Sequence, residues 1–368
     1  MADIITGFFK ETQIYTKTGW QHVKDIQAGT LVPTMNPYTR EVFYTPVVSI
    51  NRYHYKGKTF THSNNSNKYN FSITKNQKLL IYREHDPIPV YLPVKSIDAD
   101  EKAYFPRFIN RWQGNMPQTV ELHYKNETKT YSIGDFLTLF AWFYLYGTKE
   151  TDNKKYISFF TPCLSNNPIF TKDLTSMGYK VYTAISYDNI PHMLRKMGFK
   201  CLAYSMIEDN FFLNYIKNEC IYSEKTEFNT VMEKLIPDFI FNLDSSLLKQ
   251  YFIRILNFYL NRRRKVKKSV REYVLFYTLK ATECFQQLML KCGQNCRIYE
   301  YEVYSKGNKK DMYMQYKAEL GMLSDKAIGT FTSSKCNEDI YKIDVPPYHN
   351  VLIKTEDRFQ LWMADSVI

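Results

Sequence analysis

The sequence has no apolar stretch long enough to cross a membrane. Its strongest apolar run, around LFAWFYLYG at 139–147, begins near Phe136 and is closed by a glycine. A membrane-spanning helix needs roughly 20 apolar residues, and this run is shorter. The amino-terminal segment MADIITGFFKE also lacks the basic region of a secretory signal and soon reaches Lys10 and Glu11. We therefore expect a protein that is neither embedded in a membrane nor secreted.

Cysteines are few, odd in number and without a repeated spacing. The seven are Cys163, Cys201, Cys220, Cys284, Cys292, Cys296 and Cys336. Such a set favours reduced thiols, so no disulfides are expected. Cys292 and Cys296 could form half of a metal site, but no second Cys or His pair follows at zinc spacing. Because the histidines also show no metal or triad spacing, we predict no metal and no other cofactor.

What the sequence does have is positive charge and aromatic side chains. Lys and Arg number 49 against 37 Asp and Glu, which gives a net charge of +12, and aromatic residues make up 16%. A length of 368 residues with 44% hydrophobic content is enough for two or three packed domains. A basic balance favours a polyanionic partner such as nucleic acid, although a diffusely basic protein without such a partner fits the charge equally well.

The order of strand-like and helix-like segments suggests an inserted domain. Residues 1–105 carry short β-branched and aromatic runs between turn signals, and residues 339–368 return to that pattern. Between them, residues 131–146 place apolar side chains at three- and four-residue spacing, with Ser132 as a candidate cap, and 246–260 form a second apolar helix. We predict an α+β protein in which a middle domain interrupts a β domain built from both chain ends.

Short segments at both chain ends resemble the sequence blocks of an intein-type Hint domain. Residues 7–32, GFFKETQIYTKTGWQHVKDIQAGTLV, resemble the opening block, and residues 71–81, FSITKNQKLLI, resemble the second, which is built on threonine-x-x-histidine. Residues 341–353, YKIDVPPYHNVLI, resemble the penultimate block, and WMADS stands where the terminal His-Asn-Ser would be. The resemblance implies an all-β Hint-like domain formed by residues 1–110 and 331–368.

The middle of the chain resembles a LAGLIDADG homing endonuclease, the usual insert in inteins. Residues 139–147 fall on its first motif, and KLIPDFIFNLDSSLLKQYFIRIL, 234–256, on the segment that leads into and through the second. LKATECFQQLMLKCG then resembles the helix that follows in each half. The resemblance implies an inserted, pseudo-symmetric αββαββα-type domain at 111–330, with halves at about 131–225 and 234–330.

The positions that should carry splicing have lost their reactive groups. Gly7 stands where the first nucleophile would be, and Gln77 replaces the histidine that acts as an acid. Ala364 and Asp365 replace the His-Asn pair whose asparagine cyclises, while Ser366 is retained. The resemblance therefore implies a chain that does not splice.

Two further features concern the same domain. Thr74 is retained from the second block, and we expect it to be a strand hydroxyl bonded to the backbone rather than a reactive group. In an alternative register the domain ends at His349-Asn350, but Val351 then offers no nucleophile. Because six residues precede the first Hint position and three follow Asp365, we expect no flanking host protein.

The endonuclease motifs are depleted in the same way. Each LAGLIDADG helix ends with a carboxylate, and the two carboxylates together hold divalent metal at the scissile phosphates. These positions hold Tyr146 and Ile255, which do not bind Mg²⁺. A shift by one residue offers only Leu145, Gly147, Arg254 and Leu256. We interpret 139–147 as a core helix that descends from an active-site helix.

A basic run follows the second motif, where the resembled fold lies over the DNA major groove. Its cations are Arg262, Arg263, Arg264, Lys265, Lys267, Lys268 and Arg271. They could contact phosphates, or they could form a solvated turn or a patch that binds an acidic protein surface.

These features predict a catalytically inactive relic of an intein and its endonuclease, with two function classes open. In the first, by family analogy, the chain is a structural component of a virus or phage particle and binds other structural proteins in the virion or host cytoplasm. In the second, it is a DNA-binding protein that uses the basic saddle without cleavage. We expect no small-molecule substrate and no membrane partner.

Overall fold

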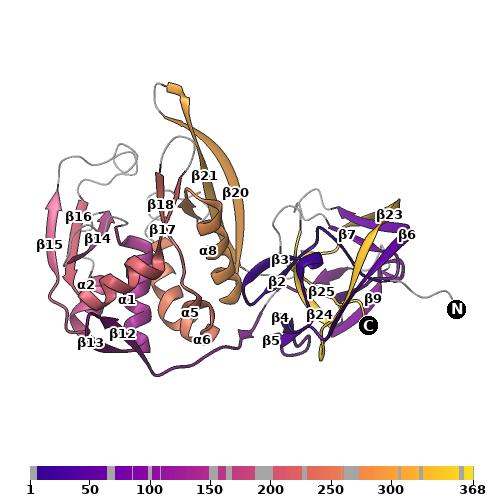
Figure 1. Ribbon diagram of the computed structural model, residues 1–368, viewed down its shortest axis with the longest axis horizontal. Helices are drawn as coiled ribbons and strands as arrows, with labels where there is room; N and C mark the ends of the chain where they lie inside the picture. Colours follow the sequence, from indigo (N-terminus) through magenta and orange to yellow (C-terminus); the bar gives the residue numbers. More distant parts are fainter. Residues whose placement is uncertain are drawn as a thin grey trace. The chain divides into compact units, whose positions relative to one another are not determined.

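The computed structural model describes residues 6–63, 71–84, 86–97, 102–107, 109–148, 156–162, 168–186, 202–225, 230–257, 259–260, 273–305, 308–322, 326–355 and 360–367. The chain divides into two units, the first formed by residues 1–113 with 322–368 and the second by residues 114–321 (Figure 1). The sequence placed these boundaries at 110/111 and 330/331. In the structure the second boundary lies at 321/322, nearer the amino terminus than predicted. The reason is that β22 (Lys326–Ala327) pairs with β10 (Ala103–Phe105) of the first unit.

The first unit consists of short strands from both ends of the chain. They are β1 (Phe8–Phe9), β2 (Gln13–Thr16), β3 (Gly19–His22), β4 (Leu31–Met35), β5 (Glu41–Pro46), β6 (Ser49–Ser63), β7 (Phe71–Thr74), β8 (Lys78–Arg83), β9 (Asp86–Pro93), β10, β11 (Arg111–Trp112), β22, β23 (Thr330–Asp344), β24 (Asn350–Lys354) and β25 (Gln360–Ala364). Their sheets have the orders β1-β23-β6-β7, β22-β10-β8-β9, β25-β24-β2-β3 and β11-β5-β4. Single 3-10 turns, Val23–Asp25 and Val94–Ser96, connect some of them.

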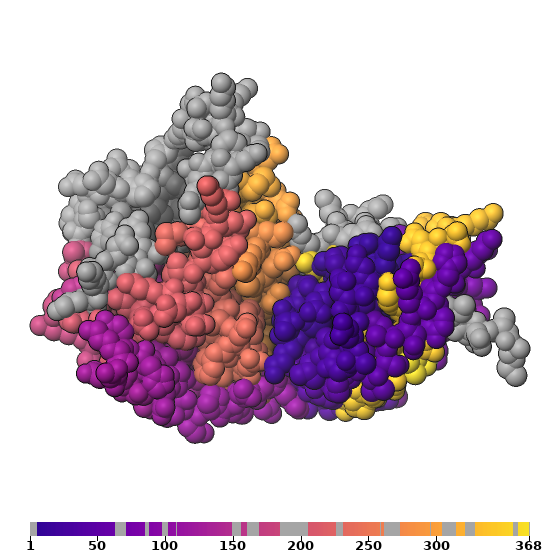
Figure 2. Space-filling view, viewed as in Figure 1, coloured from indigo at the N-terminus to yellow at the C-terminus, as the bar shows by residue number. Residues whose placement is uncertain are grey.

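Strand pairing joins the two chain ends within this unit. Phe8 of β1 lies opposite Tyr341 of β23, and Ile14 of β2 lies opposite Ile353 of β24. Figure 2 shows the indigo amino-terminal and yellow carboxy-terminal segments in contact on one face of the unit. Apolar side chains from both ends fill one core, including those of Phe8, Ile14 and Ile353. Residues far apart in the sequence are therefore neighbours here.

The second unit repeats one order of elements. Each half opens with a hairpin, β12 (Thr119–Tyr124) with β13 (Glu127–Ser132), and β17 (Ile221–Lys225) with β18 (Thr230–Lys234). An apolar helix follows each hairpin. In the first half it is α1 (Ile133–Tyr146). In the second half α5 (Asp238–Phe241) comes first, and then α6 (Ser245–Leu248) continues through the π-type turn η4 (Lys249–Ile253) into helical residues 254–257 and 259–260.

A three-stranded sheet completes each half with the same strand order. The first half has β14 (Tyr156–Pro162), α2 (Pro168–Ser176), β15 (Tyr182–Ser186), β16 (Leu202–Glu208), α4 (Asn210–Tyr215) and the π-type turn η3 (Ile216–Cys220). The second has β19 (Tyr273–Phe276), α8 (Leu279–Lys291), β20 (Gln294–Ser305) and β21 (Asn308–Met322). The sheet orders β14-β16-β15 and β19-β21-β20 both place the third strand in the middle. The mixture of helices and strands is compatible with the predicted α+β class.

Local sequence explains α1. Ser132 caps the helix, because its side chain accepts a hydrogen bond of 3.1 Å from the Asp135 N–H, as predicted. The residues at helical spacing are buried, Phe136 and Phe140 fully, so the predicted core helix is confirmed. The chain leaves the helix at Gly147, whose N–H bonds the carbonyl of Phe143. Within the described ranges, no helix has the length and apolarity that a bilayer span requires.

The two apolar helices pack side by side in the core of this unit. The ring of Phe252 lies 6.2 Å from that of Phe140 and 5.8 Å from that of Tyr144, measured between centroids. Farther along, Tyr146 meets Tyr259 at 5.3 Å. Contacts that advance together along both helices indicate that the helices run parallel.

Candidate functional site

The first unit brings five sequence-predicted positions to one place. The hydroxyl of Thr6, which precedes Gly7, donates to the carbonyl oxygen of Ser366 at 2.6 Å. The Gln77 side-chain amide donates to the carbonyl oxygens of Ala364 at 2.8 Å and Asp365 at 2.9 Å. Gly7, Gln77 and the three residues Ala364, Asp365 and Ser366 thus lie close together around the end of β25.

Gly7 lies against the backbone of β23. A Cβ atom built at Gly7 would lie 2.8 Å from the carbonyl oxygen of Tyr341, 3.1 Å from its carbonyl carbon and 3.2 Å from the Ile340 side chain. The next residue, Phe8, is paired with Tyr341, so neither strand is free to move away. The position predicted for the first nucleophile therefore has no room for a side chain.

Gln77 holds the end of β25 from the turn that follows β7. Its side chain is fully buried. Its backbone N–H donates a hydrogen bond to the carbonyl oxygen of Thr74 at 3.1 Å. A carboxamide N–H polarises a carbonyl as a hydrogen-bond donor, but it cannot transfer a proton near neutral pH. Gln77 can thus position the Asp365–Ser366 peptide group, but it cannot act as an acid on that bond.

Three polar atoms near these positions are buried without partners. Thr74 Oγ1, Gln77 Oε1 and Ser366 Oγ form no hydrogen bond in the part of the chain that the structure describes. The expectation that the Thr74 hydroxyl bonds the backbone is therefore wrong. Leaving a buried polar group unpaired costs about 1–3 kcal/mol.

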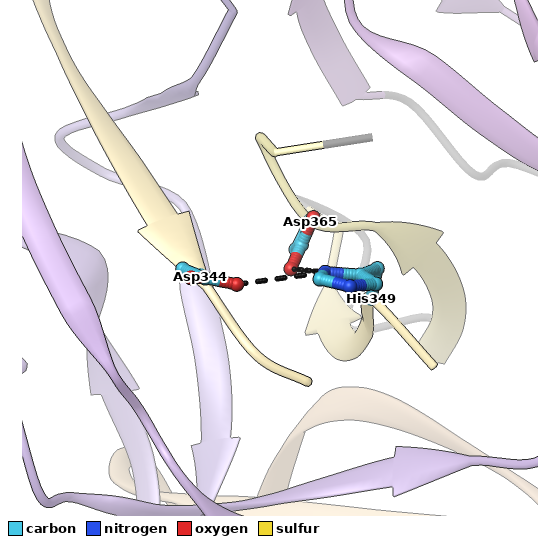
Figure 3. A group of neighbouring side chains, drawn as sticks. All are labelled: Asp344, His349 and Asp365. Carbon is cyan, nitrogen blue, oxygen red and sulfur yellow. Dashed lines mark hydrogen bonds and ion pairs between the residues drawn. The ribbon is translucent and has the colours of Figure 1, made fainter. Parts of the chain in front are cut away.

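Sequence reasoning missed a group formed by Asp344, His349 and Asp365 (Figure 3). The Nδ1 atom of His349 lies 2.9 Å from Asp365 Oδ2 and 3.5 Å from Asp344 Oδ1. Backbone N–H groups also hold Asp365: Val345 donates to Oδ2 at 2.8 Å, and Val367 donates to Oδ1 at 2.9 Å. The three residues follow no sequence motif, because the end of β23, the next turn and the end of β25 meet only through the strand pairing.

The second unit carries no carboxylate at the predicted metal positions. Tyr146 and Ile255 are both buried, at 6% and 1% exposure. On the second helix, the ring in contact with Tyr146 is that of Tyr259, which lies beyond Ile255. Ile255 and Tyr259 are the two candidate counterparts of Tyr146 on the second helix. The first side chain is apolar and the second is a phenol, so neither offers the oxygen ligands that Mg²⁺ prefers.

A lysine occupies the end of α1 instead. The Nζ atom of buried Lys234 donates to the carbonyl oxygens of Phe143 at 2.9 Å and Tyr144 at 3.0 Å. Carbonyls in the last turn of a helix lack partners within the helix and carry partial negative charge. The ammonium group adds a second hydrogen bond to the Phe143 carbonyl, which also accepts from the Gly147 N–H, and it places a cation at this helix end.

The remaining sequence-predicted groups add no reactive centre to the described residues. The basic run from Arg262 to Arg271 lies outside the described residues, as do Cys163 and Cys201. Cys220, Cys284, Cys292, Cys296 and Cys336 are unpaired, as expected. Burial raises the pKa of Cys292 to about 12 and that of Cys284 to about 11, so both remain protonated and unreactive at neutral pH.

Three solved structures show distant similarity to this chain. No protein-family model matches the chain, and no curated protein matches it. Among solved structures, a bacterial intein-like domain from Clostridium thermocellum is similar at 18% identity over 27% of this chain and 65% of that domain, with a TM-score of 0.22. A mutant of a Ssp DnaB mini-intein variant is similar at 13% identity, over 28% of this chain and 63% of the mini-intein, with a TM-score of 0.23.

A DnaB intein from Synechocystis sp. PCC 6803 is similar at 12% identity over 28% of this chain and 70% of the intein, with a TM-score of 0.23. The chain therefore spans less than two thirds of the length of the first two structures. All three likenesses are to intein or intein-like domains and cover about a quarter of the chain. At these TM-scores they carry no argument about function.

Proposed function

We propose that this chain is a Hint-like protein that does not splice, with an inserted endonuclease-like domain that does not cleave, and that it serves by binding rather than by catalysis. One observation carries the proposal. The first unit holds residues next to Gly7 and residues around Asp365 together, yet backbone atoms of β23 fill the space that a nucleophile at Gly7 would need. On this proposal, the arrangement of a splicing junction persists around a position that cannot react.

The terminal step is blocked for a second reason. Cyclisation needs the nitrogen of a terminal asparagine side chain as the nucleophile, and Asp365 has only oxygens. Both oxygens already accept backbone hydrogen bonds, Oδ2 from the Val345 N–H and Oδ1 from the Val367 N–H. A carboxylate held by donors on both oxygens is a stabilised acceptor and a poor nucleophile.

Three features of the second unit support a non-cleaving endonuclease-like insert. Its halves repeat hairpin, helix, strand, helix and two further strands with the same sheet order. Its two apolar helices run parallel and in contact. No carboxylate stands at Tyr146, Ile255 or Tyr259, and Lys234 supplies a cation at the end of α1 where a nuclease would need a metal. Phosphodiester hydrolysis needs that metal.

In the structural form of the proposal, the chain is a component of an assembly, such as a virus or phage particle, and its partners are other structural proteins. The support is that each unit has a large buried apolar core, although the residues expected to carry the chemistry are replaced. The alternative is a DNA-binding protein, which the net charge of +12 and the basic run at 262–271 favour.

Salt-dependent DNA binding separates the two forms. One variant replaces five of the cations in 262–268 with glutamine. Its control makes the same change in charge on exposed residues of the first unit, namely Lys56, Lys58, Lys75, Lys95 and Lys335. In the structural form, dissociation constants stay no tighter than about 10⁻⁴–10⁻⁶ M at physiological salt, and both variants weaken binding alike. The 262–268 variant then impairs assembly.

The DNA-binding form has a different signature. The wild-type protein then binds a duplex tightly. Only the 262–268 variant lowers the steepness of log K against log salt, and its slope falls by roughly four to five units, at about 0.9 per lost phosphate contact. That result, with the fold intact by circular dichroism, would overturn the structural form of the proposal.

A further inference from the structure

The group formed by Asp344, His349 and Asp365 has the spacing of ligands around one ion. Each residue offers one ligand atom, and all of these atoms lie within 4.8 Å of one another. Transition metals bind imidazole nitrogen and carboxylate oxygen at about 2.0–2.2 Å, so ligands at adjacent positions are about 3 Å apart. The observed distances from His349 Nδ1, 2.9 Å to Asp365 and 3.5 Å to Asp344, fit that spacing.

The charges at this group are unbalanced. His349 is the ion-pair partner of both carboxylates, and within the described ranges no Lys or Arg pairs with Asp344 or Asp365. Asp344 Oδ1 is buried and accepts no hydrogen bond there. Asp339 on the same strand shows the contrast, because it pairs with both His54 and Arg52. A neutral imidazole donates one proton from Nδ1, which cannot serve two carboxylates fully.

We propose that Asp344, His349 and Asp365 bind one divalent transition-metal ion, such as Zn²⁺, Mn²⁺ or Co²⁺. The imidazole ligand favours these ions over Ca²⁺ and Mg²⁺, which take oxygen ligands. The side chain of Asp365 is fully buried, while those of Asp344 and His349 are 23% and 28% exposed, so the ion enters from solvent on their side. Waters complete its coordination.

Surrounding groups preorganise this site. The N–H groups of Val345 and Val367 fix the Asp365 carboxylate. The backbone of His349 is also tied in place, since its N–H bonds the carbonyl of Val345 and its carbonyl accepts from the Asp365 N–H. Outer partners of this kind orient ligands and raise metal affinity. The bound ion fastens the end of β25 to the end of β23, and this role is independent of whether the chain descends from an intein.

Metal titration of the full chain tests the site. The protein is first treated with a chelator, and then Zn²⁺ is titrated by calorimetry and Co²⁺ by visible absorption. We expect one equivalent of each ion to bind and Zn²⁺ to raise the melting temperature. His349→Asn keeps a residue tolerant of the positive φ of 50° but removes the imidazole, and it should weaken binding at least about 100-fold. Asp365→Asn should do the same.

His54→Asn is the matched control, because His54 also contacts an aspartate through Nδ1, at 3.1 Å, but Arg52 already balances that carboxylate. It should leave binding unchanged. The proposal is overturned if no equivalent of Zn²⁺ or Co²⁺ binds above the level of the His349→Asn variant. It is also overturned if His54→Asn reduces binding as much as His349→Asn, which would indicate scattered surface sites.

Discussion

Replacing Gly7 with alanine tests whether the backbone has closed over the predicted splice position. A Gly→Ala change normally stabilises a protein by about 0.4–1 kcal/mol when the backbone conformation is compatible, because the unfolded chain loses entropy. Here the new methyl group would lie 2.8 Å from the Tyr341 carbonyl oxygen. Forcing an extra carbon into a packed site costs about 1–3 kcal/mol. The contact is with paired backbone, so the second effect should dominate, and we expect Gly7→Ala to lower the free energy of unfolding by about 1–2 kcal/mol.

Gly134→Ala is the matched control. A Cβ atom at Gly134 would also lie 2.8 Å from its nearest neighbour, but that neighbour is the hydroxyl at the tip of the Tyr251 side chain. The tip can rotate away, and alanine in a helix is favoured over glycine by about 0.8–1 kcal/mol. We expect this variant to be as stable as the wild-type protein or more stable.

Chemical denaturation with two probes measures both variants. Trp20, Trp112 and Trp362 lie in the first unit and Trp142 in the second, so tryptophan fluorescence reports mainly on the unit that contains Gly7. Circular dichroism at helical wavelengths reports on the second unit. If Gly7→Ala matches or exceeds the wild-type stability, side chains fit at this position and the steric part of the account is wrong.

Three further outcomes are expected. Asp209→Asn should lower the free energy of unfolding, measured by urea titration, by about 3–5 kcal/mol. The reason is that the buried carboxylate pairs with Lys129 at 2.9 Å and accepts a hydrogen bond from Tyr131. A loss below about 1 kcal/mol would count against a structural role for this network. Burial lowers the pKa of Lys291 from 10.5 to about 8, so the unfolded chain binds more protons between these pH values. The free energy of unfolding of the wild type minus that of Lys291→Met should therefore rise by roughly 3 kcal/mol as the pH increases across that interval. A difference that does not change with pH would contradict the shift. With no carboxylate at Tyr146, the protein should not nick supercoiled DNA with Mg²⁺ or Mn²⁺, and metal-dependent nicking lost on mutating one carboxylate would show that the motifs are misaligned.

Features set by neighbouring residues could be predicted from the sequence, and features set by strand pairing could not. The cap at Ser132 and the buried side chains of α1 follow from spacing within a few residues, and α8 ends before Gly293, whose φ of 73° is the left-handed conformation that favours glycine at a helix end. The group at His349 depends on strands far apart in the chain, so spacing gave no signal. The Thr74 prediction failed because a strand pattern does not tell which hydroxyls find a partner.

The most direct test of the central claim is whether the protein stays uncut. The claim is that Gly7, Gln77 and residues 364–366 are held together as at a splice junction but cannot react. The purified protein is incubated for days with a thiol or with hydroxylamine, which trap thioesters and esters, and its intact mass is then measured. The account predicts the mass of the uncut 368-residue chain and no other species. A fragment cut next to Gly7 or Ser366 would contradict it, because either bond could break only if the junction still reacts.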